Sequence, residues 1–152
     1  MEAETFETRS GEETTDLGRR LAKTLQAPEL VLLTGDLGAG KTTLTKGLIS
    51  GLGAGEEEEV LSPTFSLIHE YPGPPKVYHI DLYRLDRVPE LDTLGLDDLW
   101  DGDAIVMIEW GEKFAEQLPA RRTEIHFEYL DDDRRRIEVR RRSSGEFQPA
   151  SG

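Results

Sequence analysis

The chain has 152 residues, which is the size of a single domain. Its net charge is −13, so it is a poor candidate for wrapping naked nucleic acid, because phosphate binding requires clustered cations. The absence of cysteine excludes a disulfide scaffold, a thiolate zinc site and a cysteine nucleophile. Residues 1–8 are acidic and polar, unlike a signal peptide, and the apolar run at residues 30–33 is too short to span a membrane. We therefore expect a soluble cytoplasmic protein.

The first third of the chain predicts a strand–turn–helix unit. In chain order we expect a short strand at residues 5–8, a helix closed by Pro28, a buried strand at 30–34, a glycine-rich turn at 35–40 and a helix at 41–52 that stops at Gly53. Ser10 and Glu13 have the spacing of a capping box at the start of the first helix. Leu17, Leu21 and Leu25 then recur along one face of that helix.

The remainder continues the alternation of strands and helices. We expect strands at 65–71 and 76–82, a helix opening at Pro89 with Leu91, Leu94 and Leu99, a buried strand at 104–108, a short helix towards Pro119 and a hairpin at 125–139. This order predicts an α/β fold of three layers, with a mostly parallel central sheet and an antiparallel C-terminal hairpin at one end. Residues 1–142 would form one domain, and the polar residues 143–152 a disordered tail.

A phosphate-binding motif begins where the first buried strand ends. Residues 35–42 fit G-x-x-x-x-G-K-[ST] at every fixed position. The candidate nucleotide contacts are Gly35, Asp36, Leu37, Gly38, Ala39, Gly40, Lys41, Thr42 and Thr43. Inward-facing amides and the positive end of the next helix would bind phosphate; Lys41 would reach the β- and γ-phosphates, Thr42 would ligate Mg²⁺ and Thr43 would contact the α-phosphate. A chance match is expected in about one such chain in a hundred, so we predict nucleoside triphosphate binding.

Two acidic residues at strand ends are candidates for the chemistry. Glu109 ends the apolar strand at 104–108, and Asp81 ends the strand before it. Both should emerge at the carboxyl edge of the sheet, where α/β folds bind ligands. We assign Glu109 to Mg²⁺, directly or through water, and Asp81 to the attacking water or to the water shell of the metal. The two roles could be exchanged, and a solvated strand end is the alternative for each.

Other residues have weaker support from the sequence. Thr64, in Ser-Pro-Thr, is a candidate sensor of the γ-phosphate or else a turn residue. Arg84 could neutralise transition-state charge or form a surface ion pair. Trp110, beside Glu109, is by burial statistics a core residue. His79 lies two residues before Asp81, but a single H-x-D is a weak indication of a metal site. No N-K-x-D guanine motif is present, which favours adenine as the base.

Charge is distributed unevenly. Residues 121–142 contain eight arginines and six acidic residues, so this stretch is +2 and the rest of the chain is −15. The run of four glutamates at 56–59 is interpreted as a solvated loop rather than an interaction tail. The basic stretch is confined to the C-terminal quarter of the chain.

The motifs together resemble the TsaE family, the bacterial ATPases needed for the threonylcarbamoyladenosine modification of tRNA. The resemblance is carried by residues 35–43, by Ser-Pro-Thr-Phe at 62–65, by His-Ile-Asp-Leu-Tyr-Arg-Leu at 79–85 and by Ile-Glu-Trp at 108–110. It implies a small P-loop ATPase of weak intrinsic turnover, with ATP and Mg²⁺ as ligands. It also implies binding to the TsaB–TsaD heterodimer, tRNA contact only through partners, and a monomer or weak self-association when free.

The same resemblance assigns roles to individual residues. Lys41 and Thr42 match the phosphate and Mg²⁺ contacts, Asp81 the acid required for hydrolysis, Glu109 the Mg²⁺ ligand, and Trp110 an aromatic residue implicated in function. Neither the glutamate run nor the arginine density of residues 134–142 is required by the family. Two alternatives stay open: a small-molecule kinase on the same fold, and a nucleotide-dependent adaptor without turnover.

Overall fold

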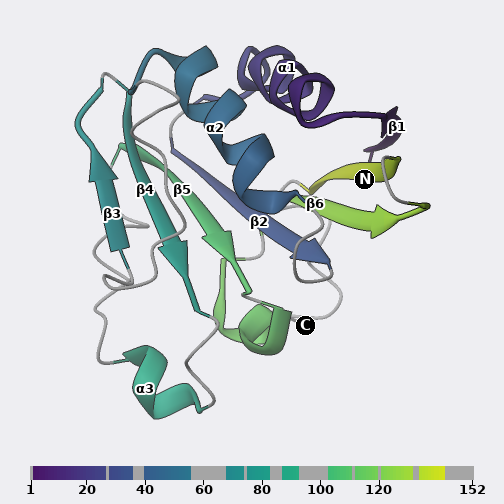
Figure 1. Ribbon diagram of the computed structural model, residues 1–152. Coiled ribbons are helices and arrows are strands. Elements are labelled where there is room, and N and C mark those ends of the chain that lie inside the picture. The colour runs from purple at the N-terminus through teal and green to yellow at the C-terminus, as the bar shows by residue number, and fades with distance from the viewer. Residues whose placement is uncertain are drawn as a thin grey trace.

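A seven-stranded sheet organises the computed structural model of the chain (Figure 1). The structure describes residues 2–26, 28–35, 40–55, 68–73, 75–82, 87–92, 103–110, 112–119, 121–131 and 134–142. The strands are β1 (Glu2–Thr8), β2 (Glu29–Gly35), β3 (Ile68–Tyr71), β4 (Lys76–Asp81), β5 (Ala104–Glu109), β6 (Arg122–Tyr129) and β7 (Arg135–Arg142). The helices are α1 (Gly11–Ala22), α2 (Lys41–Leu52), the short α3 (Val88–Asp92) and the 3₁₀ helix η2 (Glu112–Gln117). Within these ranges no helix is both long and apolar enough to cross a membrane.

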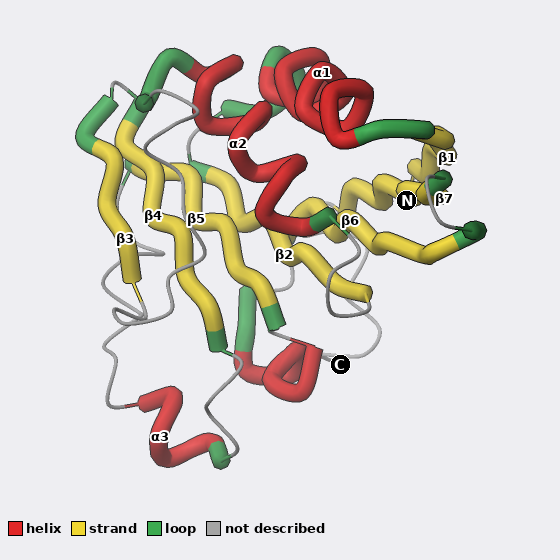
Figure 2. Tube along the Cα trace, in the orientation of Figure 1, coloured by secondary structure: helices red, strands yellow, loops and turns green. Residues whose placement is uncertain are grey.

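The centre of the sheet is parallel and its two ends are antiparallel, and Figure 2 shows the strands side by side with α1 and α2 on one face. The strand order is β1-β7-β6-β2-β5-β4-β3. Strands β6, β2, β5 and β4 run parallel to one another, whereas β3 pairs antiparallel with β4, and β7 pairs antiparallel with both β6 and β1. The predicted α/β class, parallel centre and C-terminal hairpin are therefore confirmed. The hairpin does not form the outer edge of the sheet, because the N-terminal strand β1 pairs with β7 and covers it.

Residue parity along the central strands separates two hydrophobic cores. Odd-numbered apolar residues of β2, β4 and β5 pack with α1 and α2 on one face; they are Val31, Leu33, Val77, Ile105 and Met107. Even-numbered residues of the same strands pack on the other face with Phe114 and Leu118; they are Leu30, Leu32, Ile80, Val106 and Ile108. Successive strand side chains point to opposite faces, so this alternation also decides which polar residues meet α2 at the strand ends.

Helix α1 begins as the sequence predicts but ends earlier. Ser10 Oγ accepts a hydrogen bond from Glu13 N at 3.1 Å, and Glu13 Oε1 accepts one from Arg9 N at 2.8 Å, so the return bond of the cap reaches one residue farther back than in a standard box. The helix ends at Ala22, not at Pro28. Short-range bonds continue the turn to Leu25, whose amide donates to the Ala22 carbonyl, and Leu25 stays in the core.

Helices α1 and α2 pack closely because glycine lies at their contact. A Cβ atom on Gly47 would lie 2.0 Å from the carbonyl oxygen of Thr15, and one on Gly18 would lie 2.5 Å from that of Leu44. Neither backbone can give way without separating the helices. The close contact holds α2, and with it the residues that follow the glycine-rich turn, against α1 and the sheet.

Other elements differ in extent from the predictions. Strand β1 begins at Glu2 instead of residue 5, and the hairpin strands extend beyond residues 125–139 to Arg122 and Arg142. Strand β3 is described only from Ile68, since residues 56–67 lie outside the described part of the chain. Helix α3 begins at Val88, one residue before the predicted start, and Leu94 and Leu99 lie outside the described residues. The short helix before Pro119 is a 3₁₀ helix, kinked at Phe114. The expected tail at 143–152 lies outside the described residues as well.

Candidate functional site

The phosphate-binding motif is placed between the end of β2 and the start of α2. Gly35 has a φ of 127°, and a Cβ atom there would lie 2.4 Å from the carbonyl oxygen of Phe127, so only glycine fits this strand end. Gly40 caps α2 with a left-handed φ of 106°. The first residue of the helix is Lys41, as predicted. Residues 36–39 of the motif lie outside the described part of the chain.

Lys41 is held in a nearly closed environment at this helix terminus. Lys41 is only 4% exposed, and its Nζ atom donates a hydrogen bond to the Gly35 carbonyl at 2.9 Å. Nζ also lies 3.4 Å from the centre of the Trp110 ring. A cation over a tryptophan face gains about 2 kcal/mol or more when both are removed from water. Trp110 is therefore at the site and not in the core as burial statistics predicted.

The backbone of Trp110 is unusual for a residue of its type. Its φ is 63°, the only positive value among the described non-glycine residues. A bulky residue in this region costs of order 1–3 kcal/mol, and such strain is concentrated at functional sites. The turn directly after β5 directs the indole towards Lys41, whereas the preceding residue, Glu109, directs its carboxylate towards Thr42.

Thr42 and Glu109 meet across the space between α2 and β5. The Thr42 hydroxyl lies 3.3 Å from Glu109 Oε1 and 3.2 Å from Oε2, and it can donate to the carboxylate. Glu109 is 3% exposed, so this carboxylate is almost fully removed from bulk water. The fold thus brings together the two residues that the sequence nominated as Mg²⁺ ligands, although they lie 67 positions apart.

His79 contacts the same carboxylate. Its Nε2 atom lies 2.5 Å from Glu109 Oε2, and the histidine is 0% exposed. Sequence reasoning passed over this residue because a lone H-x-D motif is weak. The useful signal was its parity: His79 and Asp81 are two residues apart on a strand and therefore share the α2 face of the sheet with Glu109.

Asp81 lies beside Glu109 on the neighbouring strand. Their Cα atoms are register partners in the parallel pair β4–β5, and the Leu82 amide donates to the Glu109 carbonyl at 3.0 Å. Asp81 is half-buried. The two strand-end acids are therefore neighbours on one face, as the sequence predicted from their strand ends. Thr64 and Arg84 lie outside the described residues.

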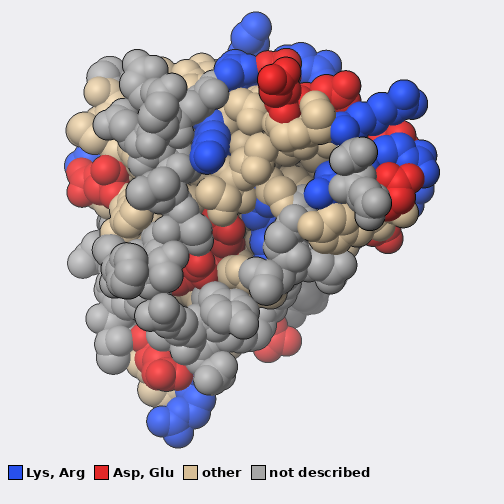
Figure 3. Space-filling view, viewed as in Figure 1, with Lys and Arg blue, Asp and Glu red and all other residues tan. Residues whose placement is uncertain are grey.

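A recess opens on the surface near this group. Figure 3 shows acidic and basic side chains meeting in a hollow near the middle of the molecule, in the view in which α2 crosses the sheet.

A cavity of about 620 Å³ lies between the start of α2 and α1. It is lined by Gly11, Glu12, Thr15, Asp16, Arg19, Thr43 and Lys46. Thr43, the predicted α-phosphate contact, therefore faces open space rather than the core.

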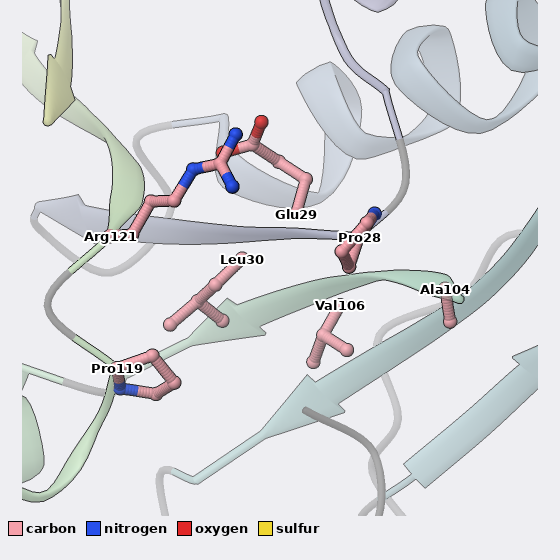
Figure 4. A pocket seen from close by; sticks show the side chains of 7 residues that line it. All are labelled: Pro28, Glu29, Leu30, Ala104, Val106, Pro119 and Arg121. Carbon is pink, nitrogen blue, oxygen red and sulfur yellow. The ribbon is translucent and has the colours of Figure 1, made fainter. Parts of the chain in front are cut away.

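A smaller pocket of about 170 Å³ lies at the amino ends of β2 and β5 (Figure 4). Leu30, Val106 and Pro119 form an apolar wall, and Glu29 and Arg121 add charge at one side. Burial raises the pKa of Glu29, against the lowering effects of the Thr123 hydroxyl, Arg121 and Arg141. The pocket begins where these strands begin, so it lies at the opposite edge of the sheet from Lys41 and Glu109.

The arginines of the C-terminal hairpin are largely matched by acids on adjacent strands, on the same strand or in the turn before it. Pairs link Arg136 with Glu128 at 2.8 Å, Arg140 with Glu138 at 2.8 Å, Arg141 with Glu4 at 2.9 Å, and Arg134 with Asp131 at 2.9 Å and Glu7 at 3.6 Å. Arg135 stacks on Tyr129, with 4.1 Å between the guanidinium carbon and the ring centre. The basic stretch is thus a ladder of surface ion pairs across β1, β7 and β6, with little uncompensated charge of the kind that phosphate binding requires.

Comparisons with known proteins agree with this geometry. The model of the family described as threonylcarbamoyl adenosine biosynthesis protein TsaE matches residues 8–137. The tRNA threonylcarbamoyladenosine biosynthesis protein TsaE of Streptomyces coelicolor is 49% identical over 108 residues, covering 68% of this chain and 70% of that protein. Its Bacillus subtilis counterpart is 41% identical over 127 residues, or 83% and 78% of the two chains. The Haemophilus influenzae protein of the same name is 45% identical over 106 residues, or 69% of this chain and 66% of its own length.

A solved structure extends the likeness to the fold. The crystal structure of Bacillus subtilis YdiB superposes with a TM-score of 0.77 and 30% sequence identity, covering 99% of this chain and 97% of that one. The agreement therefore includes the flanking antiparallel strands as well as the parallel centre of the sheet.

Proposed function

Because the chain belongs to the TsaE family of threonylcarbamoyl adenosine biosynthesis proteins, we propose that it is a magnesium-dependent ATPase that serves the threonylcarbamoyladenosine modification of tRNA. The observation that carries the proposal is the meeting of α2 and β5. One turn of α2 supplies a buried cation and a hydroxyl, Lys41 and Thr42, and the end of β5 supplies the Glu109 carboxylate that faces them.

Lys41 and the amides at the start of α2 would bind the phosphates. An ammonium group removed from water attracts phosphate oxygens more strongly than an exposed one, since the local dielectric is low. Nζ is already desolvated between the Gly35 carbonyl and the Trp110 ring. Exchanging the carbonyl for phosphate oxygens would replace a neutral acceptor by a charged one, which strengthens the hydrogen bond.

The residues around Glu109 fit a magnesium ion. Mg²⁺ prefers oxygen ligands and usually takes only one or two from protein, with water and phosphate supplying the others. Thr42 and Glu109 provide such oxygens side by side. Among the described residues no group of three or more His, Cys, Asp or Glu could hold a metal ion, which is compatible with a site completed by nucleotide. Bound there, the metal would neutralise charge on the phosphates.

Asp81 is the candidate to act on the attacking water. It is half-buried beside Glu109 and reaches the same carboxyl edge of the sheet. A carboxylate can accept a hydrogen bond from a water molecule and so direct a lone pair of that water towards phosphorus. A positioned base of this kind typically raises the reaction rate by roughly 10²–10⁴-fold. Glu109 faces Thr42, the other predicted Mg²⁺ ligand, which favours the metal role for Glu109 and assigns the water role to Asp81 at the neighbouring strand end.

The ATPase would act with protein partners, namely the TsaB–TsaD heterodimer, and would meet tRNA through them in the cytoplasm. A net charge of −13 opposes direct binding to an RNA backbone. The ion-paired arginines of β7 supply little free positive charge to offset it. We expect the free protein to be a monomer or to self-associate weakly.

Phosphate release from ATP, measured with and without purified TsaB–TsaD, tests the proposal. We expect slow Mg²⁺-dependent release by the chain alone and faster release with the pair. Phosphate appearing on a metabolite instead of in solution would indicate a small-molecule kinase. Tight ATP binding with no release under either condition would indicate an adaptor, and absence of ATP binding by the folded chain would overturn the proposal altogether.

A further inference from the structure

His79 is a buried polar residue that a structural role does not explain. It lies on β4 between Val77 and Asp81, on the face of the sheet that packs against α2, and it is 0% exposed. Its register partner on β5 is Met107, a core residue. An aliphatic side chain would fill such a position without burying two ring nitrogens, and a buried polar group costs free energy unless it is hydrogen-bonded.

The contact with Glu109 fixes the tautomer of the imidazole. A carboxylate oxygen accepts, so in the 2.5 Å contact with Oε2 the hydrogen is carried by His79 Nε2. The other nitrogen, Nδ1, is buried and has no hydrogen-bond partner among the described residues. The residue therefore leaves one ring nitrogen without a partner among the described residues while it makes a single bond to Glu109, and this bond is what it contributes to the site.

We propose that His79 is a positioning residue that orients the Glu109 carboxylate for magnesium. The imidazole holds Oε2 from the β4 side, which fixes the rotation of the carboxylate about its last bond. In this orientation the carboxylate presents both oxygens to the Thr42 hydroxyl, 3.3 Å from Oε1 and 3.2 Å from Oε2. Groups that hydrogen-bond to metal ligands typically change metal affinity by 10- to 100-fold when removed. The inference rests on the proposed magnesium–nucleotide function and names a residue that acts through Glu109.

Metal affinity with a nucleotide that cannot be hydrolysed gives the first test. Mn²⁺ binding to the complex with an imido analogue of ATP is followed by electron paramagnetic resonance for wild type, His79→Leu and His79→Gln. We expect His79→Leu to weaken Mn²⁺ binding by 10- to 100-fold, with metal-free nucleotide binding unchanged. The amide introduced by His79→Gln keeps an N–H donor near the position of Nε2, so this variant should restore affinity to within about threefold of wild type.

A matched control lies one strand farther from Glu109. His69 is the register partner of His79 in β3–β4, and it is only partly buried. His69→Leu removes an imidazole from the same sheet face and should leave Mn²⁺ affinity unchanged. If His79→Leu and His79→Gln bind Mn²⁺ as tightly as wild type, or if both weaken it equally, orientation through the N–H donor is wrong.

Nitrogen-15 spectra of the ligand-free wild type give a readout that does not depend on folding of a variant. We expect the wild-type spectrum to show the hydrogen of His79 on Nε2, whereas a hydrogen on Nδ1 alone would overturn the inference. The two proposals fail differently. Wild type that binds neither Mn²⁺ nor nucleotide would contradict the proposed function, whereas normal binding in wild type and in His79→Leu would contradict only the role of His79.

Discussion

Charged side chains gather in two regions of the molecule, and these regions differ in burial. At the carboxyl edge of the sheet, Lys41, Glu109 and His79 are each at most 4% exposed. On the strands β1, β7 and β6, the arginines of β7 form solvent-exposed ion pairs with acids of β1, of β6 and of β7 itself. The second region has more charges, but each is worth little, since exposed pairs contribute about 0–1 kcal/mol.

Burial, rather than the number of charges, therefore identifies the candidate site around Lys41 and Glu109. Removing a charged group from water costs several kcal/mol, so a fold retains it there only with strong partners or for a function. The hairpin arginines form a basic stretch in the sequence, but in the structure they lie beside acidic residues. Substitutions at buried positions should therefore change binding, turnover or stability more than substitutions in the exposed region.

Lys41→Ala should abolish ATP binding in isothermal calorimetry. The change removes a desolvated cation, and losing two charged hydrogen bonds of about 1.5–3 kcal/mol each weakens binding by about 100-fold or more. Lys76→Ala is the matched control, because Lys76 is exposed and pairs with Glu70 at 3.2 Å. If Lys41→Ala still shows a heat of association with ATP, the prediction that the buried cation binds the phosphates is wrong.

Asp81→Asn and Glu109→Gln should each reduce phosphate release by at least about 100-fold, while changing ATP affinity far less. Both keep the shape of the side chain and remove its charge at the strand end. Single-turnover measurements with radiolabelled ATP separate binding from hydrolysis. Turnover equal to wild type in both variants would contradict the assigned roles, and a difference between them in Mg²⁺ dependence would divide those roles.

Glu29→Gln tests a carboxylate of intermediate burial at the opposite edge of the sheet. Burial raises the pKa of Glu29 above its ordinary value of 4.5, so the folded state holds its proton more tightly than the unfolded state. The contribution of Glu29 to wild-type stability should therefore fall as the pH rises from 4.5 through the raised pKa. Urea unfolding should show that the stability of Glu29→Gln relative to wild type increases as the pH rises above 4.5. A relative stability that decreases over the same change in pH would mean that the hydrogen bond from Thr123 outweighs burial.

Arg136→Ala should have the smallest effect. Its partner Glu128 is exposed, so we expect the free energy of unfolding to change by less than about 1 kcal/mol and ATP binding to stay the same. Urea titration and calorimetry check both. A triple variant, Arg134→Glu with Arg135→Glu and Arg136→Glu, extends the test to TsaB–TsaD: lost binding to that pair with ATP binding intact would show that the exposed region has a function after all.

Local sequence determined the helices, the strands and the phosphate motif. Helix α2 runs over Lys41–Leu52 as predicted, and β5 ends at Glu109, because apolar periodicity and glycine act within a few residues. The early end of α1 and the pairing of β1 with β7 were not predicted. Both depend on contacts between segments distant in the chain: Leu25 reaches the core through a turn, and β1 covers a strand from the opposite end of the sequence.

The sequence by itself therefore determined that a phosphate-binding turn exists and that Asp81 and Glu109 end strands, since each depends on neighbours along the chain. Only the tertiary structure decided that the Glu109 carboxylate meets Thr42 and His79, that the Trp110 ring covers Lys41, and that the hairpin arginines are paired. The physical reason is that strand register and helix packing set distances between residues far apart in sequence. Those distances and the burial that accompanies them determine which charges are available for chemistry.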